Sequence, residues 1–208
     1  QEPRGLALDS SGRLYVADPL NHRIQVYQVI SNTLSYSSTI GETGVISTTT
    51  GLFNYPVRLT LDSLDRLYIA DTNNHRIQRC AYSSGWTCED FFGVAGESGS
   101  DPGYLSSPWG VVVRGDRVLI ADSGNARVIE CDLDANCVLF AGTPTEFGSD
   151  NDQFGWASDV AMDSAGYVYV SDSSTNHRVQ VFDSDGDYLR TIGVTGVPYL
   201  TNPTLFNQ

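Results

Sequence analysis

Short apolar runs bounded by Gly, Asp, Asn and Ser dominate the hydrophobic pattern of this chain. Leu14-Tyr15-Val16-Ala17-Asp18 is typical, because β-branched and aromatic residues fill it and turn-forming residues follow it. Runs of this composition and length predict β-strands joined by turns. No long segment shows the 3.6-residue period of an amphipathic helix. The pattern therefore predicts an all-β protein.

The same blocks recur four times along the chain. The aspartates that end the second block are at positions 18, 71, 122 and 172, so the period is 53, 51 and 50 residues. A fourth, less regular strand follows in each copy, as at Asp187-Tyr188-Leu189-Arg190-Thr191-Ile192-Gly193. Four strands at this period predict a β-propeller blade. We expect one domain of four antiparallel four-stranded blades, at about 3–55, 56–107, 108–156 and 157–208, with innermost strands near 4–9, 57–62, 109–113 and 159–163.

The third block carries a family resemblance. Asn21-His22-Arg23-Ile24-Gln25-Val26 resembles the motif that names the NHL repeat family, and it is echoed by Asn74-His75-Arg76, Asn125-Ala126-Arg127 and Asn176-His177-Arg178. The resemblance covers essentially the whole chain. It implies a propeller with loops on two faces, in a family whose members are mostly interaction modules and, in bacteria, often extracellular parts of larger proteins. Some relatives with related blades are lyases or lactonase-like hydrolases.

The number of copies leaves two arrangements open. NHL propellers usually have six blades, so four copies form either a complete four-bladed ring or part of a larger propeller or array. If four blades do not close, the faces near residues 1–30 and 190–208 lack a neighbour. Such faces would expose apolar side chains and need another chain or further blades to cover them.

Charge narrows the choice of partner. The formal net charge is -13 and only 12 Lys and Arg residues are present. A chain with this charge repels polyanions, so we expect neither nucleic acid nor an anionic membrane surface as a partner. No apolar run approaches the ~20 residues that span a bilayer, so we expect no membrane insertion.

The four cysteines form two local pairs, Cys80 with Cys88 and Cys131 with Cys137. Neither pair has the C-x-x-C spacing of a structural zinc site. Aligning the repeats places Cys80 and Cys131 at the end of the third strand and their partners across the following hairpin, where antiparallel Cβ atoms lie close enough for a bridge. We predict two disulfides, which form in oxidising compartments. The chain is therefore expected outside the cell, secreted or at the cell surface.

Repeated polar residues surround the turn between the second and third strands. Each Asp is expected to accept backbone N–H bonds in the turn and to pair with the Arg five or six residues later. The set is Asp18, Asn21, His22 and Arg23; Asp71, Asn74, His75 and Arg76; Asp122, Asn125 and Arg127; and Asp172, Asn176, His177 and Arg178.

The three histidines admit two interpretations. Three His side chains could ligate zinc, and the aspartates could form an acidic ring that holds a cation. Repetition favours a structural role instead, in which each His bonds locally to the Asp or Asn of its repeat. We therefore expect no catalytic metal on His22, His75 and His177.

Asp183, Asp185 and Asp187 alternate as calcium ligands do. The segment lacks the downstream Glu of an EF-hand, since the twelfth position of that loop is Val194. It also coincides with the hairpin between the third and fourth strands, where Asp and Gly favour a turn. Turn formation is the favoured interpretation and calcium the alternative; no other cofactor is expected.

No nucleophile elbow, P-loop, HExxH or dinucleotide motif occurs in the sequence. We therefore predict an extracellular binding or assembly module for a protein ligand, a glycan or neighbouring copies. The alternatives are a structural subunit of a secreted fibre or surface layer, and a propeller hydrolase or lyase with a metal in the central channel.

Overall fold

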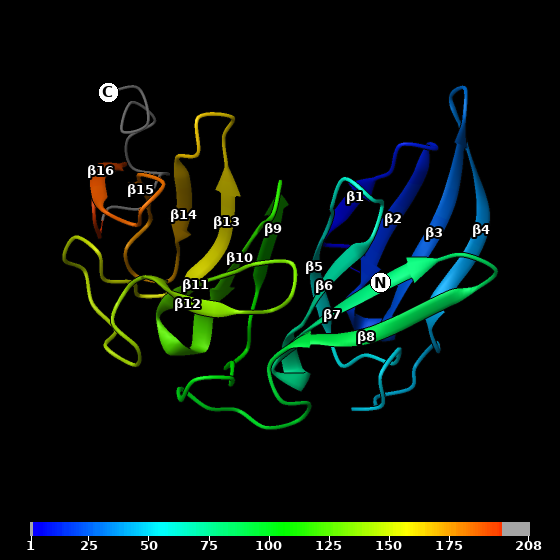
Figure 1. The fold of residues 1–208 in the computed structure, drawn as a ribbon, viewed down its shortest axis with the longest axis horizontal. Helices are drawn as coiled ribbons and strands as arrows, with labels where there is room; N and C mark the ends of the chain where they lie inside the picture. The colour runs from blue at the N-terminus through cyan, green and yellow to red at the C-terminus, as the bar shows by residue number, and fades with distance from the viewer. Residues whose placement is uncertain (1, 197–208) are drawn as a thin grey trace.

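The structure is a computed structural model that describes residues 2–196. It confirms the all-β class, with four antiparallel sheets of four strands each (Figure 1). The strands are β1 (Leu6–Leu8), β2 (Arg13–Asp18), β3 (Arg23–Ile30) and β4 (Thr33–Gly41) in blade 1; β5 (Pro56–Leu61), β6 (Leu67–Asp71), β7 (Arg76–Tyr82) and β8 (Trp86–Phe92) in blade 2; β9 (Gly110–Arg114), β10 (Arg117–Asp122), β11 (Arg127–Cys131) and β12 (Cys137–Ala141) in blade 3; and β13 (Ala157–Met162), β14 (Val168–Asp172), β15 (Arg178–Phe182) and β16 (Tyr188–Ile192) in blade 4.

Each blade is a meander, in which consecutive strands are neighbours in the sheet. In the first three blades a short 3₁₀ turn joins the second and third strands: η1 (Pro19–Asn21), η2 (Thr72–Asn74) and η3 (Ser123–Asn125). The residue after each turn has a left-handed backbone, with φ of 54° at His22, 55° at His75 and 52° at Ala126. This conformation ends the turn and starts the third strand.

The blades follow one another in an arc. The innermost strands β1, β5, β9 and β13 contact each other in that order, and no ladder hydrogen bonds join one sheet to the next within residues 2–196. Blade 1 and blade 4 lie on opposite sides of the molecule in Figure 1. The described residues therefore form an open series of four blades.

Three hydrophobic clusters hold the arc together, one between each pair of successive blades. Blades 1 and 2 enclose Tyr15, Ala17, Leu67 and Ile69, all fully buried. The linker into each following blade adds a buried apolar side chain: Phe53, Leu105 and Phe154. A sheet cannot cover both of its faces alone, so each interior blade depends on two neighbours.

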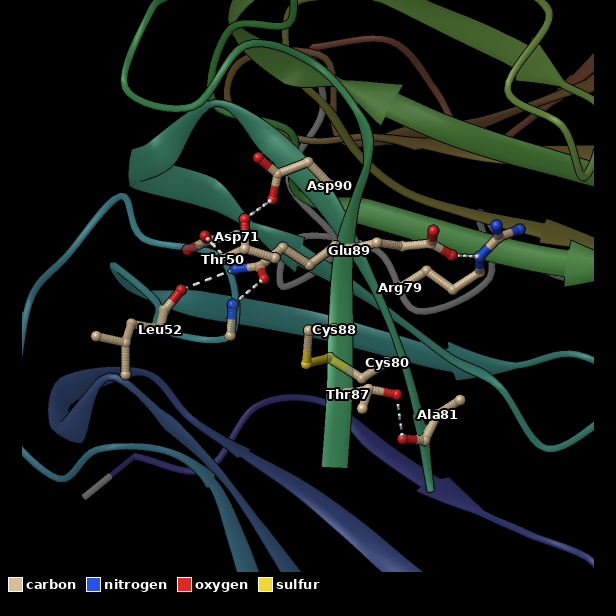
Figure 2. The surroundings of a disulfide bond; sticks show 12 residues. Thr50, Leu52, Asp71, Arg79, Cys80, Ala81, Thr87, Cys88, Glu89 and Asp90 are labelled. Atoms are coloured by element: carbon tan, nitrogen blue, oxygen red, sulfur yellow. Dashed lines mark hydrogen bonds and ion pairs between the residues drawn. A yellow bond between two sulfur atoms is a disulfide. The ribbon is translucent and has the colours of Figure 1, made fainter. Parts of the chain in front are cut away.

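Two disulfides close the outer hairpins of blades 2 and 3. Cys80 pairs with Cys88 and Cys131 with Cys137 in the strand register, and both pairs are bonded. Figure 2 shows the first bridge between β7 and β8, with the ion pair of Arg79 and Glu89 beside it.

Blades 1 and 4 have aromatic pairs in the same places. Tyr27 lies opposite Tyr36 with ring centroids 6.2 Å apart, and Phe182 lies opposite Tyr188 at 6.1 Å. Bridge and ring pair thus occupy one structural position, where each joins the outermost strand to the rest of its blade.

Candidate functional site

The repeated aspartates and arginines pair as the spacing predicts. The Arg Nε lies 2.9 Å from the Asp Oδ2 in the pair Asp18–Arg23, 2.9 Å in Asp71–Arg76, 2.7 Å in Asp122–Arg127 and 3.0 Å in Asp172–Arg178. The Asn of each repeat also donates to its aspartate. Burial raises the pKa of the Asp71 and Asp122 carboxyls, and the facing guanidinium groups oppose that rise.

In blades 2 to 4 these arginines also reach across the blade junction. Arg76 donates to the carbonyl oxygens of Thr48, Thr49 and Leu52, which lie in the linker from blade 1. Arg127 reaches the carbonyls of Ser100 and Tyr104, and Arg178 those of Ser149, Asp150 and Gln153. We call each Asp–Asn–Arg set with its bound linker a blade latch. Its geometry assigns these repeated residues a structural role between blades.

His22 and His75 bond to the linker that follows their blade, whereas the arginines of blades 2 to 4 bond to the linker that precedes theirs. His22 Nδ1 accepts the backbone N–H of Tyr55 at 3.1 Å, and His75 Nδ1 accepts that of Ser107 at 3.0 Å. The expectation of a local bond to the Asp or Asn of the same repeat was wrong. The reason is the left-handed backbone after the turn, because it directs the imidazole over the linker that enters the next blade.

The histidines do not gather at one place. Each of His22 and His75 contacts its own downstream linker, and His177 is exposed on blade 4. Within residues 2–196, no three His, Cys, Asp or Glu side chains lie close enough to hold a metal ion.

Asp183 sits in the hairpin between β15 and β16 and caps it. Its Oδ1 accepts the backbone N–H groups of Asp185 at 3.0 Å and of Asp187 at 2.9 Å. Asp9, Asp62 and Asp163 make the same turn between the first and second strands of their blades. The alternating aspartates at 183–187 thus have the geometry of a recurrent turn.

Sequence reasoning missed a pocket at the inner edge of the arc. Its volume is about 610 Å³, and its lining includes Arg58, Trp109, Trp156, Ser158, Asp159 and Tyr169. Blades 2, 3 and 4 all contribute, mainly through the innermost strands and the residues just before them. We call this the inner-edge pocket.

Aromatic rings form one side of the inner-edge pocket. The indoles of Trp109 and Trp156 meet edge to face, with centroids 6.0 Å apart and planes at 79°. The guanidinium of Arg4 lies 5.5 Å from the ring of Trp109 and 5.8 Å from that of Tyr55, within cation–π range. These contacts fix the indoles beside the pocket.

An ion pair forms the other side. Arg58 on β5 reaches Asp159 on β13 at 2.8 Å, so it joins blade 2 to blade 4. Blade 3 has Gly110 at this level, and a Cβ there would lie 2.8 Å from the Asp159 Cα. Burial raises the pKa of Asp159, and the charge of Arg58 opposes that rise. The Nε of Arg58 is buried and has no hydrogen-bond partner within the described residues.

A break in the repeat marks this pocket in the sequence. Latch positions hold the same residue types in all four blades. The positions of Arg4, Val57, Trp109 and Ser158, and those of Gly5, Arg58, Gly110 and Asp159, differ from copy to copy. Residues that differ between copies, at positions on or just before the innermost strands, are therefore the sequence signal that indicates the pocket.

Among solved structures, the fold is similar to that of several proteins. They include a chain of a nidogen/laminin complex (TM-score 0.67, 16% identity, 93% of this chain and 66% of that one) and a streptogramin B lyase (0.64, 12%, 98% and 56%). Another is an auxiliary nutrient binding protein from Bacteroides thetaiotaomicron (0.59, 15%, 89% and 46%). At these identities the likeness shows the fold alone, and the chain spans 46% to 66% of their lengths.

Curated relatives resemble part of the chain. NHL repeat-containing protein 2 of Gallus gallus is 37% identical over 86 residues, which is 38% of this chain and 11% of the relative. The chain thus matches only a small part of that protein. The NHL repeat itself matches at residues 1–27, 53–80, 105–130 and 154–182, in all four blades. Together with the four-bladed fold, these matches show that the chain belongs to the NHL repeat family.

Proposed function

We propose that this chain is an extracellular binding module whose ligand occupies the inner-edge pocket, and that the ligand is a carbohydrate. The observation that carries the proposal is that two indoles and the Arg58–Asp159 ion pair line one cavity. Ligand pockets of about 300–1,000 Å³ typically combine aromatic walls with a few fixed polar groups. This pocket, of about 610 Å³, has that size and composition.

The chemistry of a sugar ring matches the two sides of the pocket. A pyranose has an apolar C–H face, which packs on the electron-rich face of an indole. Its rim of hydroxyls both donates and accepts hydrogen bonds. The exposed part of the Arg58 guanidinium offers donors, and the Asp159 carboxylate and the Ser158 hydroxyl offer acceptors.

Two further features support a module that acts outside the cell. Both disulfides would persist only in an oxidising compartment. Solved structures with a similar fold include an auxiliary nutrient binding protein and a chain of a nidogen/laminin complex.

The part of the chain that the structure describes contains no helix of the length and hydropathy needed to cross a membrane.

Tryptophan fluorescence tests the proposal, because two of the three tryptophans line the pocket. The protein is titrated with a panel of neutral and acidic mono- and oligosaccharides. We expect a saturable change with at least one sugar, and at least tenfold weaker binding for Trp109→Ala and Trp156→Ala. Trp86→Phe, on β8 of blade 2 and outside the pocket lining, is the matched control and should bind as the unchanged protein does.

Two results would contradict the proposal. One is the absence of binding by any sugar while a peptide panel binds with the same dependence on Trp109, which would assign a protein ligand to the pocket. The other is sugar binding that neither pocket substitution weakens.

A further inference from the structure

We propose that the outer edge of blade 3 binds an extended segment of a partner protein, which adds to β12 as a fifth strand and alternates apolar with basic side chains. The site lies where the outermost strands of blades 2 and 3 meet, whereas the inner-edge pocket is built mainly on the innermost strands. The inference is therefore independent of the ligand in that pocket.

A cavity opens between blades 2 and 3 at this outer edge. Its volume is about 340 Å³. Residues of β11, β12, the end of β8 and the linker between the two blades line it, among them Ile129, Cys137, Leu139, Phe92, Pro102 and Gly103. A Cβ at Gly103 would meet no atom within 4 Å, so the space beside the linker is open. We call this the outer-edge cavity.

The outer-edge cavity lies where the repeat changes. In blades 2 and 4 a glutamine of the third strand holds the incoming linker: Gln78 accepts the N–H of Gly51 at 2.8 Å, and Gln180 accepts that of Asp152 at 2.9 Å. Blade 3 has Ile129 at this position. Because an alkyl side chain accepts no hydrogen bond, the linker into blade 3 is not held against β11 at this point.

The facing residue on the outermost strand changes in the same way. Leu139 lies opposite Ile129, whereas β8 has Asp90 and β16 has Thr191 at the equivalent position. A polar pair in blades 2 and 4 is thus an apolar pair in blade 3, and Leu139 is 50% exposed. Exposed apolar side chains beside a cavity are typical of a surface that another molecule covers.

The free edge of β12 supplies backbone hydrogen-bonding groups beside the cavity. β12 is the last strand of its sheet and pairs with β11 only. The hairpin bond from the N–H of Asp132 to the carbonyl of Asn136 fixes the alternation of this ladder. The next pair, Cys131 and Cys137, therefore exchanges no ladder hydrogen bonds. The N–H and C=O groups of Cys137, and by alternation those of Leu139, point away from β11, where an added strand can bond to them.

This edge is also uncharged and fixed in place. The outermost strands β8 and β16 carry charged residues, such as Glu89 and Arg190, whereas β12 has none. Charged side chains discourage pairing at a sheet edge, so their absence favours it. The disulfide between Cys131 and Cys137 bonds β12 to β11, so the edge is ordered before a partner binds, which lowers the entropic cost of binding.

The other side of β12 is acidic. Val138 lines a second hollow, of about 240 Å³, together with Asp116, Glu130 and Asp132. Arg117 pairs with Glu130 at 2.6 Å, so one positive charge stands against three negative charges around this hollow. A basic side chain is the electrostatic complement of this side.

The two sides of β12 define the chemistry of the added segment. Alternate side chains of a strand point to opposite faces of its sheet. One set would enter the outer-edge cavity, and the other would lie over the acidic hollow. The partner is therefore an extended segment in which Val, Leu or Ile alternates with Lys or Arg. The net charge of -13 also attracts such a segment over a distance.

A synthetic peptide of about eight residues that alternates Val or Leu with Lys is the probe. Fluorescence anisotropy of the labelled peptide should show saturable binding to this chain. Hydrogen exchange followed by NMR should show that the bound peptide slows exchange of the Cys137 and Leu139 amides. The Val138 amide should be unaffected, because it belongs to a pair that already bonds to Glu130 of β11.

Two substitutions test the two sides separately. Leu139→Asp places a charge at the cavity and should weaken binding of the probe about tenfold. Asp116→Lys reverses a charge at the acidic hollow and should weaken binding about twofold to fivefold. Leu189→Asp is the matched control, because Leu189 is exposed on the outermost strand of blade 4 and is not part of the cavity lining. It should bind as the unchanged chain does, and circular dichroism should show that all three variants are folded.

Two control peptides complete the experiment: one with the same residues in scrambled order, and one methylated on its backbone nitrogens. Neither should show saturable binding in the concentration range where the probe binds. Equal binding of the methylated peptide, or slower exchange in β4 or β8 instead of β12, would overturn strand addition at this edge. A probe that does not bind, or that binds Leu139→Asp as well as it binds the unchanged chain, would overturn the site itself.

Discussion

The backbone N–H of Ser107 donates to Nδ1 of His75 at 3.0 Å, although the two residues are 32 positions apart in the chain. The bond joins the turn of blade 2 to the linker that enters blade 3. Only an unprotonated Nδ1 can accept it, so the junction between these blades depends on a neutral imidazole. Burial lowers the pKa of His75, and the charge of Asp71 opposes that shift.

This bond makes stability depend on pH. Because the pKa of His75 is lower in the folded than in the unfolded protein, the stabilisation is complete above about pH 6.5 and decreases as the pH falls below it. His75→Ala should therefore cost about 1 kcal/mol in urea unfolding at pH 7.5 and less at pH 5. His177→Ala, at an exposed position, is the control. An equal loss for His75→Ala at both pH values would show that the imidazole acts only by packing.

The lowered pKa of Asp9 predicts a second loss of folding stability, at a lower pH. Burial by itself would raise its pKa, but hydrogen bonds from the Arg13 backbone and side chain, Ser11 and Tyr15 outweigh burial and lower it to about 2. A lowered carboxyl pKa stabilises the fold above the unfolded value of about 3.9, and this contribution, about 2 kcal/mol, is lost as the pH falls toward 2. NMR titration of the Asp9 carboxyl checks the pKa. Asp9→Asn should remove most of this acid sensitivity, and an unchanged acid transition would contradict the prediction.

Replacing Arg76 should destabilise the fold more than replacing Arg23, because the Arg76 side chain is fully buried. Arg76→Met would leave Asp71 charged and buried without its partner, which typically costs about 3–5 kcal/mol. Arg23→Met should cost clearly less, because the Arg23 side chain is partly exposed and binds only Asp18 and Thr43 among the described residues. Guanidinium unfolding of both variants measures the difference. Equal losses would mean that the linker carbonyls contribute little to the latch.

Position 110 has no room for a side chain, so only glycine fits there. A Cβ at Gly110 would lie 2.8 Å from the Cα of Asp159, so Gly110→Ala must displace the backbone of blade 4 next to the inner-edge pocket. We expect a destabilisation of about 1–3 kcal/mol and weaker ligand binding. Gly85→Ala is the control, since no atom lies within 4 Å of its Cβ position. Unaltered thermal unfolding of Gly110→Ala would contradict the close packing of β9 on β13.

Removing one disulfide should lower the free energy of unfolding by a modest but measurable amount. Each closes a short loop, with sequence separations of 8 and 6, so the loss on removal should be about 2–3 kcal/mol. Cys131→Ala with Cys137→Ala should therefore lower the unfolding midpoint without abolishing the fold. Titration of the denatured, unreduced protein should find no free thiols. Four reactive thiols would refute both bridges.

Much of this molecule follows from local sequence. Neighbouring strands, turns, Asp–Arg pairs and disulfides each join residues of one blade that are close in the chain. Alternation of apolar residues and their spacing are therefore sufficient to predict them. Repetition strengthened each of these predictions, because four copies show the same pattern.

The tertiary structure alone decided which residues meet across blades. His22 meets Tyr55, and Arg58 meets Asp159, because the arc brings strands of different blades to one inner edge. No spacing in the chain encodes that approach, since it depends on how the sheets stack and on the small residue, Gly110, that allows it. The chain sequence therefore determined the blade, whereas the packing of one blade on the next determined the pocket and the bonds from each latch arginine to the preceding linker.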